Sequence, residues 1–141
     1  MFVKSTVGEW AVKKSKQNIL TDTQRRKFQH EMANWAKHYG KQVFEKGPEW
    51  AEVNIAGNMI IVSMKGYLTK YEKFILKSEG KDNNSVKESR LQAAKGIIFD
   101  GSPKRYIEER LNVEVLGYVV EIVAEEEISF WIILLDTYLT L

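Results

Sequence analysis

The sequence holds few side chains whose type and spacing are suited to catalysis or metal binding. It contains no Cys, which excludes thiolate catalysis, cysteine-ligated zinc, iron–sulfur clusters and disulfides. Its two histidines, His30 and His38, are eight residues apart, or roughly 80° in projection on a helix. Histidine pairs that bind a metal on one helix are spaced by about four residues. We therefore expect both histidines at the surface or at the boundary of the core, and predict no metal site.

Two groups of carboxylates stand out. Glu125, Glu126 and Glu127 fall at a predicted hairpin tip, where alternate side chains diverge. A solvated turn is therefore favoured over a cation site, which needs converging oxygen ligands. Asp136 lies inside the apolar last strand, where a buried carboxylate would need a partner. We expect Asp136 to lie near the strand end and to reach water.

Thr69 and Glu72 form the hydroxyl–carboxylate pair that most resembles a catalytic pair. Their T-x-x-E spacing is that of a capping box, so we interpret both as helix-capping residues. Glycine-rich phosphate loops and the GxSxG and HExxH motifs are absent from the sequence. The residues therefore predict a protein that is not an enzyme, with no catalytic residue and no cofactor, and no cofactor-binding position can be identified.

The elements that must position these residues follow from the hydrophobic spacing. Apolar residues at 28, 32, 35 and 39 form the stripe of an amphipathic helix that starts at a capping box at Thr21 and ends before Gly47-Pro48. Alternation over 51–55, a turn at 57–58 and an apolar run over 59–64 predict a hairpin. Capping boxes at Thr69 and Ser85 predict two more helices. A break over 100–103 predicts a restart of the last helix with Ser102 as its N-cap.

Two long strands, over about 113–124 and 127–139, complete the domain. The predicted fold class is α+β, in the order α-β-β-α-α-β-β, with a four-stranded, largely antiparallel sheet and helices packed on one face. Both faces of the last strand are apolar, so both should be covered. Because the helices cover one face only, the other needs a partner, and we predict a homodimer or higher oligomer. The candidate interface residues are Phe130, Trp131, Ile132, Ile133, Leu134 and Leu135.

We expect residues 1–18 to form a flexible basic arm and residues 19–141 a single domain. The first 18 residues lack the apolar core of a signal peptide, and the longest apolar stretch, 128–135, is shorter than the roughly 20 residues that span a bilayer. The sequence therefore predicts a cytoplasmic protein. Charge is uneven, at +9 over residues 1–105 and −7 over residues 106–141. This uneven distribution of charge fits three interpretations: solvated surface charge, which we favour, self-association, and contact with an anionic surface.

Residues 46–76, KGPEWAEVNIAGNMIIVSMKGYLTKYEKFIL, resemble a bacterial family named for one component of a sodium-translocating, membrane-potential-generating system, the MpsC-like family. The resemblance extends over roughly residues 20–139, and the closing ISFWIILLD at 128–136 is also similar. Leu111-Asn112 stands where many relatives have Thr-Gly. The positions that match the family pattern are turn and capping residues, namely Gly47, Pro48, Gly66, Thr69, Glu72 and Arg90.

The resemblance implies a small soluble protein tied in some members to membrane-bound sodium or bicarbonate transport, and it brings no catalytic residue. The leading hypothesis is a non-enzymatic, oligomeric accessory or regulatory subunit, peripheral at the inner face of the membrane, with a membrane-protein partner. The alternative is a small-ligand-binding domain, with its site between helices and sheet or at the dimer seam. A third, less favoured hypothesis is nucleic-acid binding through the basic first helix.

Overall fold

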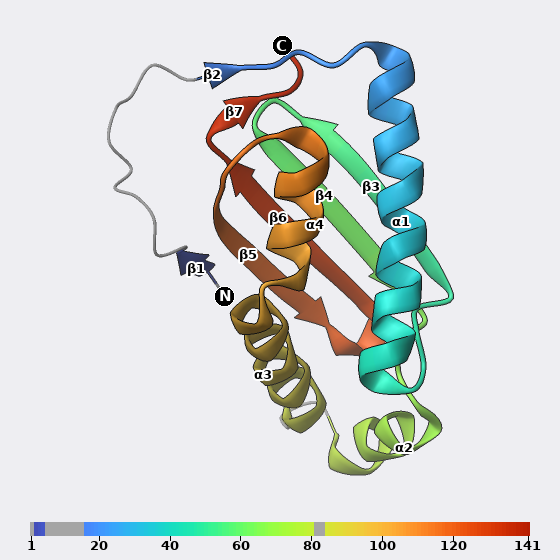
Figure 1. The fold of residues 1–141 in the computed structure, drawn as a ribbon. Coiled ribbons are helices and arrows are strands. Elements are labelled where there is room, and N and C mark those ends of the chain that lie inside the picture. The colour runs from blue at the N-terminus through green and yellow to red at the C-terminus, as the bar shows by residue number, and fades with distance from the viewer. Residues whose placement is uncertain (1, 5–15, 81–83) are drawn as a thin grey trace.

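The scaffold of the molecule is a five-stranded sheet in which every neighbouring pair is antiparallel (Figure 1). The structure, a computed structural model, describes residues 2–4, 16–80 and 84–141. The strands lie in the spatial order β1-β5-β6-β4-β3. They are β1 (Phe2–Lys4), β3 (Trp50–Ala56), β4 (Met59–Lys65), β5 (Val115–Val123) and β6 (Ile128–Leu135). The predicted α+β class and the four-stranded antiparallel sheet are confirmed by β3 to β6, and β1 extends the sheet beside β5.

The helices cover one face of this sheet, as predicted. Figure 1 shows α1 (Asp22–Phe44), α3 (Ser85–Asp100) and α4 (Ser102–Leu111) in front of the strands, and α2 (Lys70–Glu79) beyond one end of them. A short 3-10 turn, η1 (Ala124–Glu126), joins β5 to β6. Within the described ranges, no helix combines the length and apolar character that a membrane span requires.

The predicted basic arm, residues 1–18, contributes two short strands. β1 pairs with β5, and β2 (Lys16–Gln17) runs parallel to β7 (Thr137–Tyr138). Residues 1 and 5–15 lie outside the described residues, so the flexibility of that segment stays a prediction.

Hydrogen bonds at the helix starts test the three predicted capping boxes. Thr21 and Gln24 bond reciprocally at the start of α1, with the Gln24 amide N–H 3.1 Å from Thr21 Oγ1. The box at Thr69 is also formed. The prediction at Ser85 is wrong, because the N-cap of α3 is Asn84, without a side-chain cap bond. The Ser85 hydroxyl donates instead to the Glu79 carboxylate, 2.8 Å away.

The predicted break between the last two helices is present, but its cap differs. Gly101 adopts a left-handed conformation (φ +82°) and separates α3 from α4. Ser102 is therefore the first residue of α4, not its N-cap, and its hydroxyl donates to the Asp100 carboxylate. A left-handed backbone conformation favours glycine, which explains why the chain turns at Gly101.

A single core fills the space between the helices and the sheet. Its largest fully buried side chains come from α1, α4, β4, β5 and β6 and from the connections between elements. They are Met32, Ile60, Leu68, Ile107, Val115, Val120, Ile133, Leu135 and Leu139. Val86 and Ala94 of α3 belong to the same core, and the candidate site lies beside it, between α1, α3 and the sheet.

Candidate functional site

Gly47 and Pro48 hold the end of α1 against the start of β3. A Cβ atom on Gly47 would lie 2.6 Å from the Lys37 carbonyl oxygen and 3.1 Å from the Lys41 amide nitrogen. Pro48 is buried, and its Cδ would lie 3.0 Å from a Cβ placed on Gly40. The chain therefore passes directly over the last turns of α1, and only glycine leaves room for it at position 47.

Gly66 ends β4 in a left-handed conformation, with φ +72°. A Cβ there would meet the Glu49 side chain at 2.7 to 3.0 Å, and the Gly66 amide donates to the Glu127 carbonyl at 3.1 Å. The turn brings the chain from β4 into α2, where the family pattern continues.

Thr69 and Glu72 cap α2, which confirms their interpretation as capping residues. The Glu72 amide donates to Thr69 Oγ1 at 3.2 Å, and the Thr69 amide donates to Glu72 Oε1 at 3.0 Å. Glu72 is therefore held at the start of α2 with its carboxylate turned toward α3.

Arg90 of α3 meets this carboxylate in a two-point ion pair. Arg90 Nε donates to Glu72 Oε2 at 2.7 Å, and Nη2 donates to Oε1 at 2.5 Å and to the Tyr67 carbonyl at 3.1 Å. The guanidinium carbon also lies 4.5 Å from the centre of the Phe44 ring. Arg90 is 8% exposed, so this pair ties α2, α3 and the end of α1 together.

The charges of this cluster are set by burial and hydrogen bonding. Burial acts to raise the pKa of Glu72, but the hydrogen bonds from Arg90 and Thr69 outweigh it and hold that pKa below its ordinary value. Burial raises the pKa of Tyr67 to about 12, although Arg90 opposes the shift. The Tyr67 hydroxyl donates to the Ile128 carbonyl at 3.0 Å. Tyr67 is thus a neutral structural donor at physiological pH.

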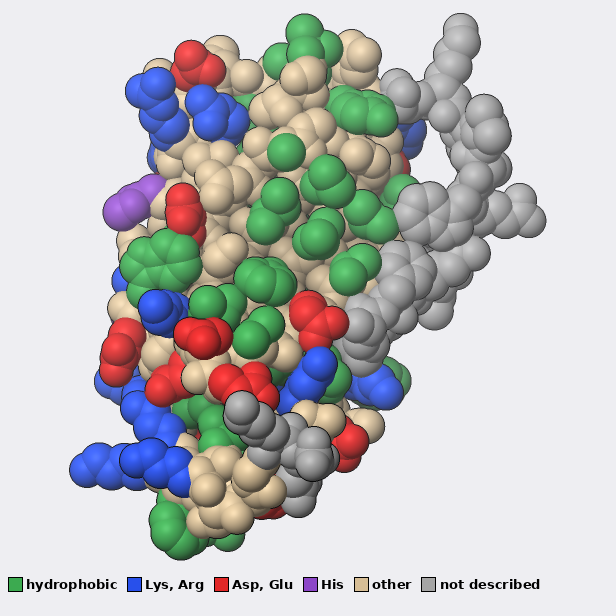
Figure 2. Space-filling view, turned by 180° about the vertical axis from the view of Figure 1, so that it is seen from behind, with side chains coloured by type: hydrophobic (Ala, Val, Ile, Leu, Met, Phe, Trp, Pro, Cys, Tyr) green, Lys and Arg blue, Asp and Glu red, His purple; other side chains and the backbone are tan. Residues whose placement is uncertain are grey.

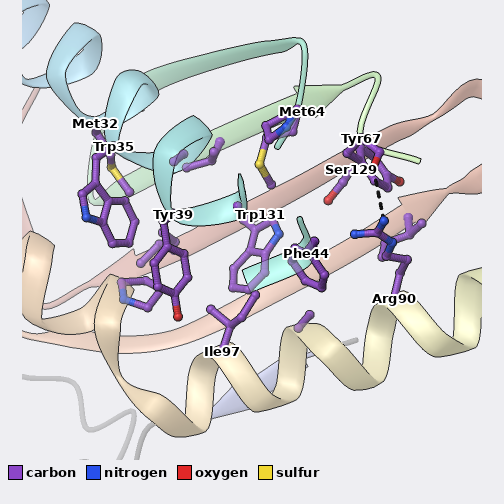
Figure 3. A pocket seen from close by; sticks show the side chains of 18 of the residues that line it. Met32, Trp35, Tyr39, Phe44, Met64, Tyr67, Arg90, Ile97, Ser129 and Trp131 are labelled. Atoms are coloured by element: carbon purple, nitrogen blue, oxygen red, sulfur yellow. Dashed lines mark hydrogen bonds between the residues drawn. The ribbon is translucent and has the colours of Figure 1, made fainter. Parts of the chain in front are cut away.

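A cavity of about 100 Å³ opens beside Arg90, between α1, α3 and the helix-covered face of the sheet. Figure 3 shows Trp35, Tyr39 and Phe44 entering it from α1, Ile97 from α3 and Trp131 from β6. Trp35 stacks on Tyr39, with ring centres 5.0 Å apart, and on Tyr106 at 4.5 Å. These stacked rings give the cavity a rigid apolar wall.

Polar groups at the cavity come from a few residues. Arg90 and Lys46 line it, and Lys46 Nζ donates to the Leu68 carbonyl at 3.1 Å. Ser129 supplies a hydroxyl. Among the described residues that line the cavity, none is a histidine or a carboxylate. The arrangement is suited to binding an apolar body near a cationic end.

The face of the sheet opposite the helices carries a second notable feature, an apolar patch. Strand register places Val119, Ile132 and Ile61 side by side in one row across β5, β6 and β4. The next row holds Leu134 and Met59, and Phe130 lies on the other side of the first row. Figure 2 shows hydrophobic side chains gathered over this face. We call these six residues the open-face patch.

The structure corrects the predicted interface of β6. Trp131, Ile133 and Leu135 point under the helices and are buried, at 8%, 1% and 0% exposed, so they belong to the chain's own core. Strand alternation turns Phe130, Ile132 and Leu134 to the open face, where none of the three is fully buried. Only these three of the six predicted residues are placed where a partner could contact them.

The other predicted residues lie apart from both features. His30 and His38 are exposed on α1, and His30 Nε2 lies 3.3 Å from the Asn34 amide nitrogen. Glu125 and Glu126 are exposed in η1, whereas Glu127 pairs with Lys73 at 3.2 Å. No group of three metal-ligating side chains occurs within residues 2–4, 16–80 and 84–141.

Asp136 lies directly after β6, near the strand end as expected, but it is more enclosed than expected. Its side chain is 16% exposed and accepts hydrogen bonds from the Glu114 amide at 2.9 Å, Thr137 Oγ1 at 2.7 Å and Lys16 Nζ at 3.2 Å. Burial acts to raise its pKa, but these bonds together lower it. Groups of the protein therefore bind this carboxylate, whereas we expected it to reach water.

The sequence singled out Gly47, Pro48, Gly66, Thr69, Glu72 and Arg90 as pattern positions but did not reveal the cavity. Of these, Pro48 and Arg90 line the cavity, and Glu72 is linked to it through its ion pair with Arg90. The aromatic wall from α1 was assigned to the core, since its helical spacing is the same for core and cavity residues. A signal was available in the aromatic-rich end of that helix, at 35, 39 and 44.

A family model described as "Na+-translocating membrane potential-generating system (MpsC)" matches residues 24–137. This range includes every one of the six pattern positions. No curated protein and no solved structure matches the chain.

Proposed function

The chain belongs to the MpsC family, and from this membership we propose that it is a non-enzymatic accessory subunit of a Na⁺-translocating, membrane-potential-generating system that acts as a self-associated pair. The observation that carries the proposal is the open-face patch. Antiparallel sheets that face water on one side normally alternate apolar and polar residues. Here β6 is apolar on both faces over Phe130 to Leu135.

The position of the patch favours a protein partner. Its residues lie on β5, β6 and β4, in the middle of the sheet. Polar and charged side chains, Glu52, Ser63 and Glu121, stand beside Phe130 in the same row. An apolar centre with a polar margin is the usual composition of a protein interface. Burial of the patch would contribute roughly 25 cal/mol for each Å² of apolar surface removed from water.

A second copy of this chain is the partner that we propose for the patch. Most soluble homo-oligomers are closed pairs in which the same surface of each copy meets its equivalent. The open-face patch is contiguous, apolar and central, so it can pack on itself without burying an unpaired charge. The aligned packing of two sheets is a common architecture for such an interface.

Contact with the membrane component would then fall elsewhere on the surface. Exposed basic residues of α1, among them Arg26, Lys27 and Lys41, offer a cationic face. Such residues favour an anionic membrane surface or an acidic partner. This is the basis on which we propose a location at the inner face of the membrane.

Two differently tagged copies, produced together in the cells from which the protein comes, test the proposal. Purification through one tag should recover the second tag, and crosslinking should add the membrane-embedded component of the Na⁺-translocating system, identified by mass spectrometry. An Ile132→Lys change should abolish recovery of the second tag. Failure to recover the second tag contradicts self-association, and absence of the membrane-embedded component contradicts the accessory role.

A further inference from the structure

We propose that the cavity beside Arg90 is a binding site for a small monocarboxylate with an apolar body no larger than about a phenyl ring. This inference is independent of the self-association proposed above. It depends on the volume of the cavity, its aromatic wall and the donors at its cationic end.

The volume and the lining define the apolar part of the ligand. Protein interiors are close-packed, and voids larger than a water molecule are few. An apolar cavity of about 150 Å³ accepts benzene. This one is smaller, at about 100 Å³, so it would enclose most of a ring only if the rest of the ligand lay in its opening. Its wall is partly exposed at Trp35, Tyr39 and Phe44, so a flat ring or a short branched chain can enter between α1 and α3.

The cationic end defines the polar part. Arg90 uses Nε and Nη2 for Glu72 and the Tyr67 carbonyl, and its Nη1 has no hydrogen-bond partner among the described residues. The side chain is 9% exposed and lines the cavity, so we infer that this unused donor is available to a ligand there. Figure 3 shows the Arg90 guanidinium directed toward the Phe44 side of the cavity. A carboxylate is the acceptor that such a donor binds most strongly.

Lys46 adds a second donor at the same end. Its ammonium donates to the Leu68 carbonyl, next to the Tyr67 carbonyl that Arg90 holds. Its ion pair with Glu49 is long, at 3.6 Å, and the Glu49 side chain is 72% exposed, so solvent screens that charge. Glu72 neutralises Arg90, and the ammonium of Lys46 is left as the charge that a monoanion would balance.

The neighbouring residues keep this end rigid. Glu72 is fixed by Thr69, and the Arg90 guanidinium lies against the rings of Phe44 and Tyr67, at 4.5 and 5.2 Å. A donor that is already oriented loses little entropy when it binds. This end offers one unused guanidinium donor and one ammonium. It therefore disfavours dianions and phosphates, which need more donors.

A titration followed by the indole N–H signals of a ¹⁵N-labelled protein tests the inference. The probes are phenylacetate, the neutral phenylacetamide, and acetate, which lacks the ring. Trp35 and Trp131 line the cavity, whereas Trp50 stands on β3 and is absent from its lining. Phenylacetate should shift the Trp35 and Trp131 signals saturably, leave Trp50 unchanged, and bind at least about tenfold more tightly than either other probe.

Three variants sharpen the result and leave Arg90, whose ion pair ties the helices together, unchanged. Lys46→Gln should weaken phenylacetate binding about tenfold, while Lys95→Gln, an exposed change on α3, should leave it unchanged. Ala94→Leu, which fills the cavity, should abolish binding by both aromatic probes. Absence of saturable shifts up to about 10 mM phenylacetate, or equal affinity for the acid and the amide, overturns the inference.

Discussion

Trp131 and Ile132 are neighbours in β6 but belong to opposite surfaces of the molecule. Trp131 is 8% exposed and forms part of the cavity wall under α1 and α3. Ile132 lies between Val119 and Ile61 on the face that the helices of the described residues leave uncovered. One strand therefore supplies both the proposed ligand site and the proposed interface, and its two apolar faces each have a separate use.

Replacing Glu72 with Gln should lower the free energy of unfolding at pH 7 by about 3 kcal/mol, because Arg90 would keep its charge inside the protein without a carboxylate. The pKa of Glu72 lies below its ordinary value of 4.5 in the folded protein. Its stabilisation is therefore complete above pH 4.5 and is lost as the pH falls through the folded-state pKa.

Urea denaturation of both proteins at pH 7 and at about pH 3 checks this. The difference in the free energy of unfolding between the wild type and Glu72→Gln should be smaller at the lower pH. Asp136, whose pKa is also lowered, is present in both proteins and cancels in the comparison. A difference that stays constant with pH would show that the ion pair is not the source.

Gly47→Ala should destabilise the protein by about 1 to 3 kcal/mol, because the new Cβ would lie 2.6 Å from the Lys37 carbonyl. Gly96→Ala is the matched control. Gly96 is helical and nothing lies within 4 Å of a Cβ placed there, so the change should stabilise by about 0.5 to 1 kcal/mol. In thermal melts, the two variants should change the stability of the protein in opposite directions. A change in the same direction would contradict the close approach of residue 47 to α1.

Tyr118→Phe should leave stability unchanged or raise it by up to about 1 kcal/mol. The Tyr118 hydroxyl is buried without a hydrogen-bond partner among the described residues, and burial raises its pKa to about 12. Removing an unsatisfied buried hydroxyl removes a desolvation cost. The ring would keep its edge-on contact with Trp131. A loss of more than about 1 kcal/mol in urea denaturation would indicate a bound partner for the hydroxyl.

Much of the fold follows from local patterns in the sequence. The capping boxes at Thr21 and Thr69, the turn at Gly57-Asn58 and the break at Gly101 each depend on residues close in the chain. The Ser85 box failed because Glu79, six residues earlier, takes the hydroxyl. Local spacing does not reveal such a competitor.

The candidate site was harder to predict because it depends on contacts between distant segments. Glu72 and Arg90 were identified as separate pattern positions, yet their ion pair joins residues 18 apart. Which face of β6 meets the helices was also open, since both faces are apolar. The structure resolves this through burial, since Trp131, Ile133 and Leu135 are buried whereas Phe130, Ile132 and Leu134 are not.

Sedimentation velocity across a concentration series up to about 100 µM determines whether the protein pairs with a second copy of itself. The wild-type protein should sediment as a species with twice the mass of one chain at high concentration and should dissociate on dilution. Ile132→Lys should remain a folded monomer throughout, whereas Gln92→Lys, an exposed change of equal charge on α3, should behave as the wild type does. A strictly monomeric wild type would contradict self-association. An Ile132→Lys variant that pairs as well as the wild type would contradict the open-face patch as its interface.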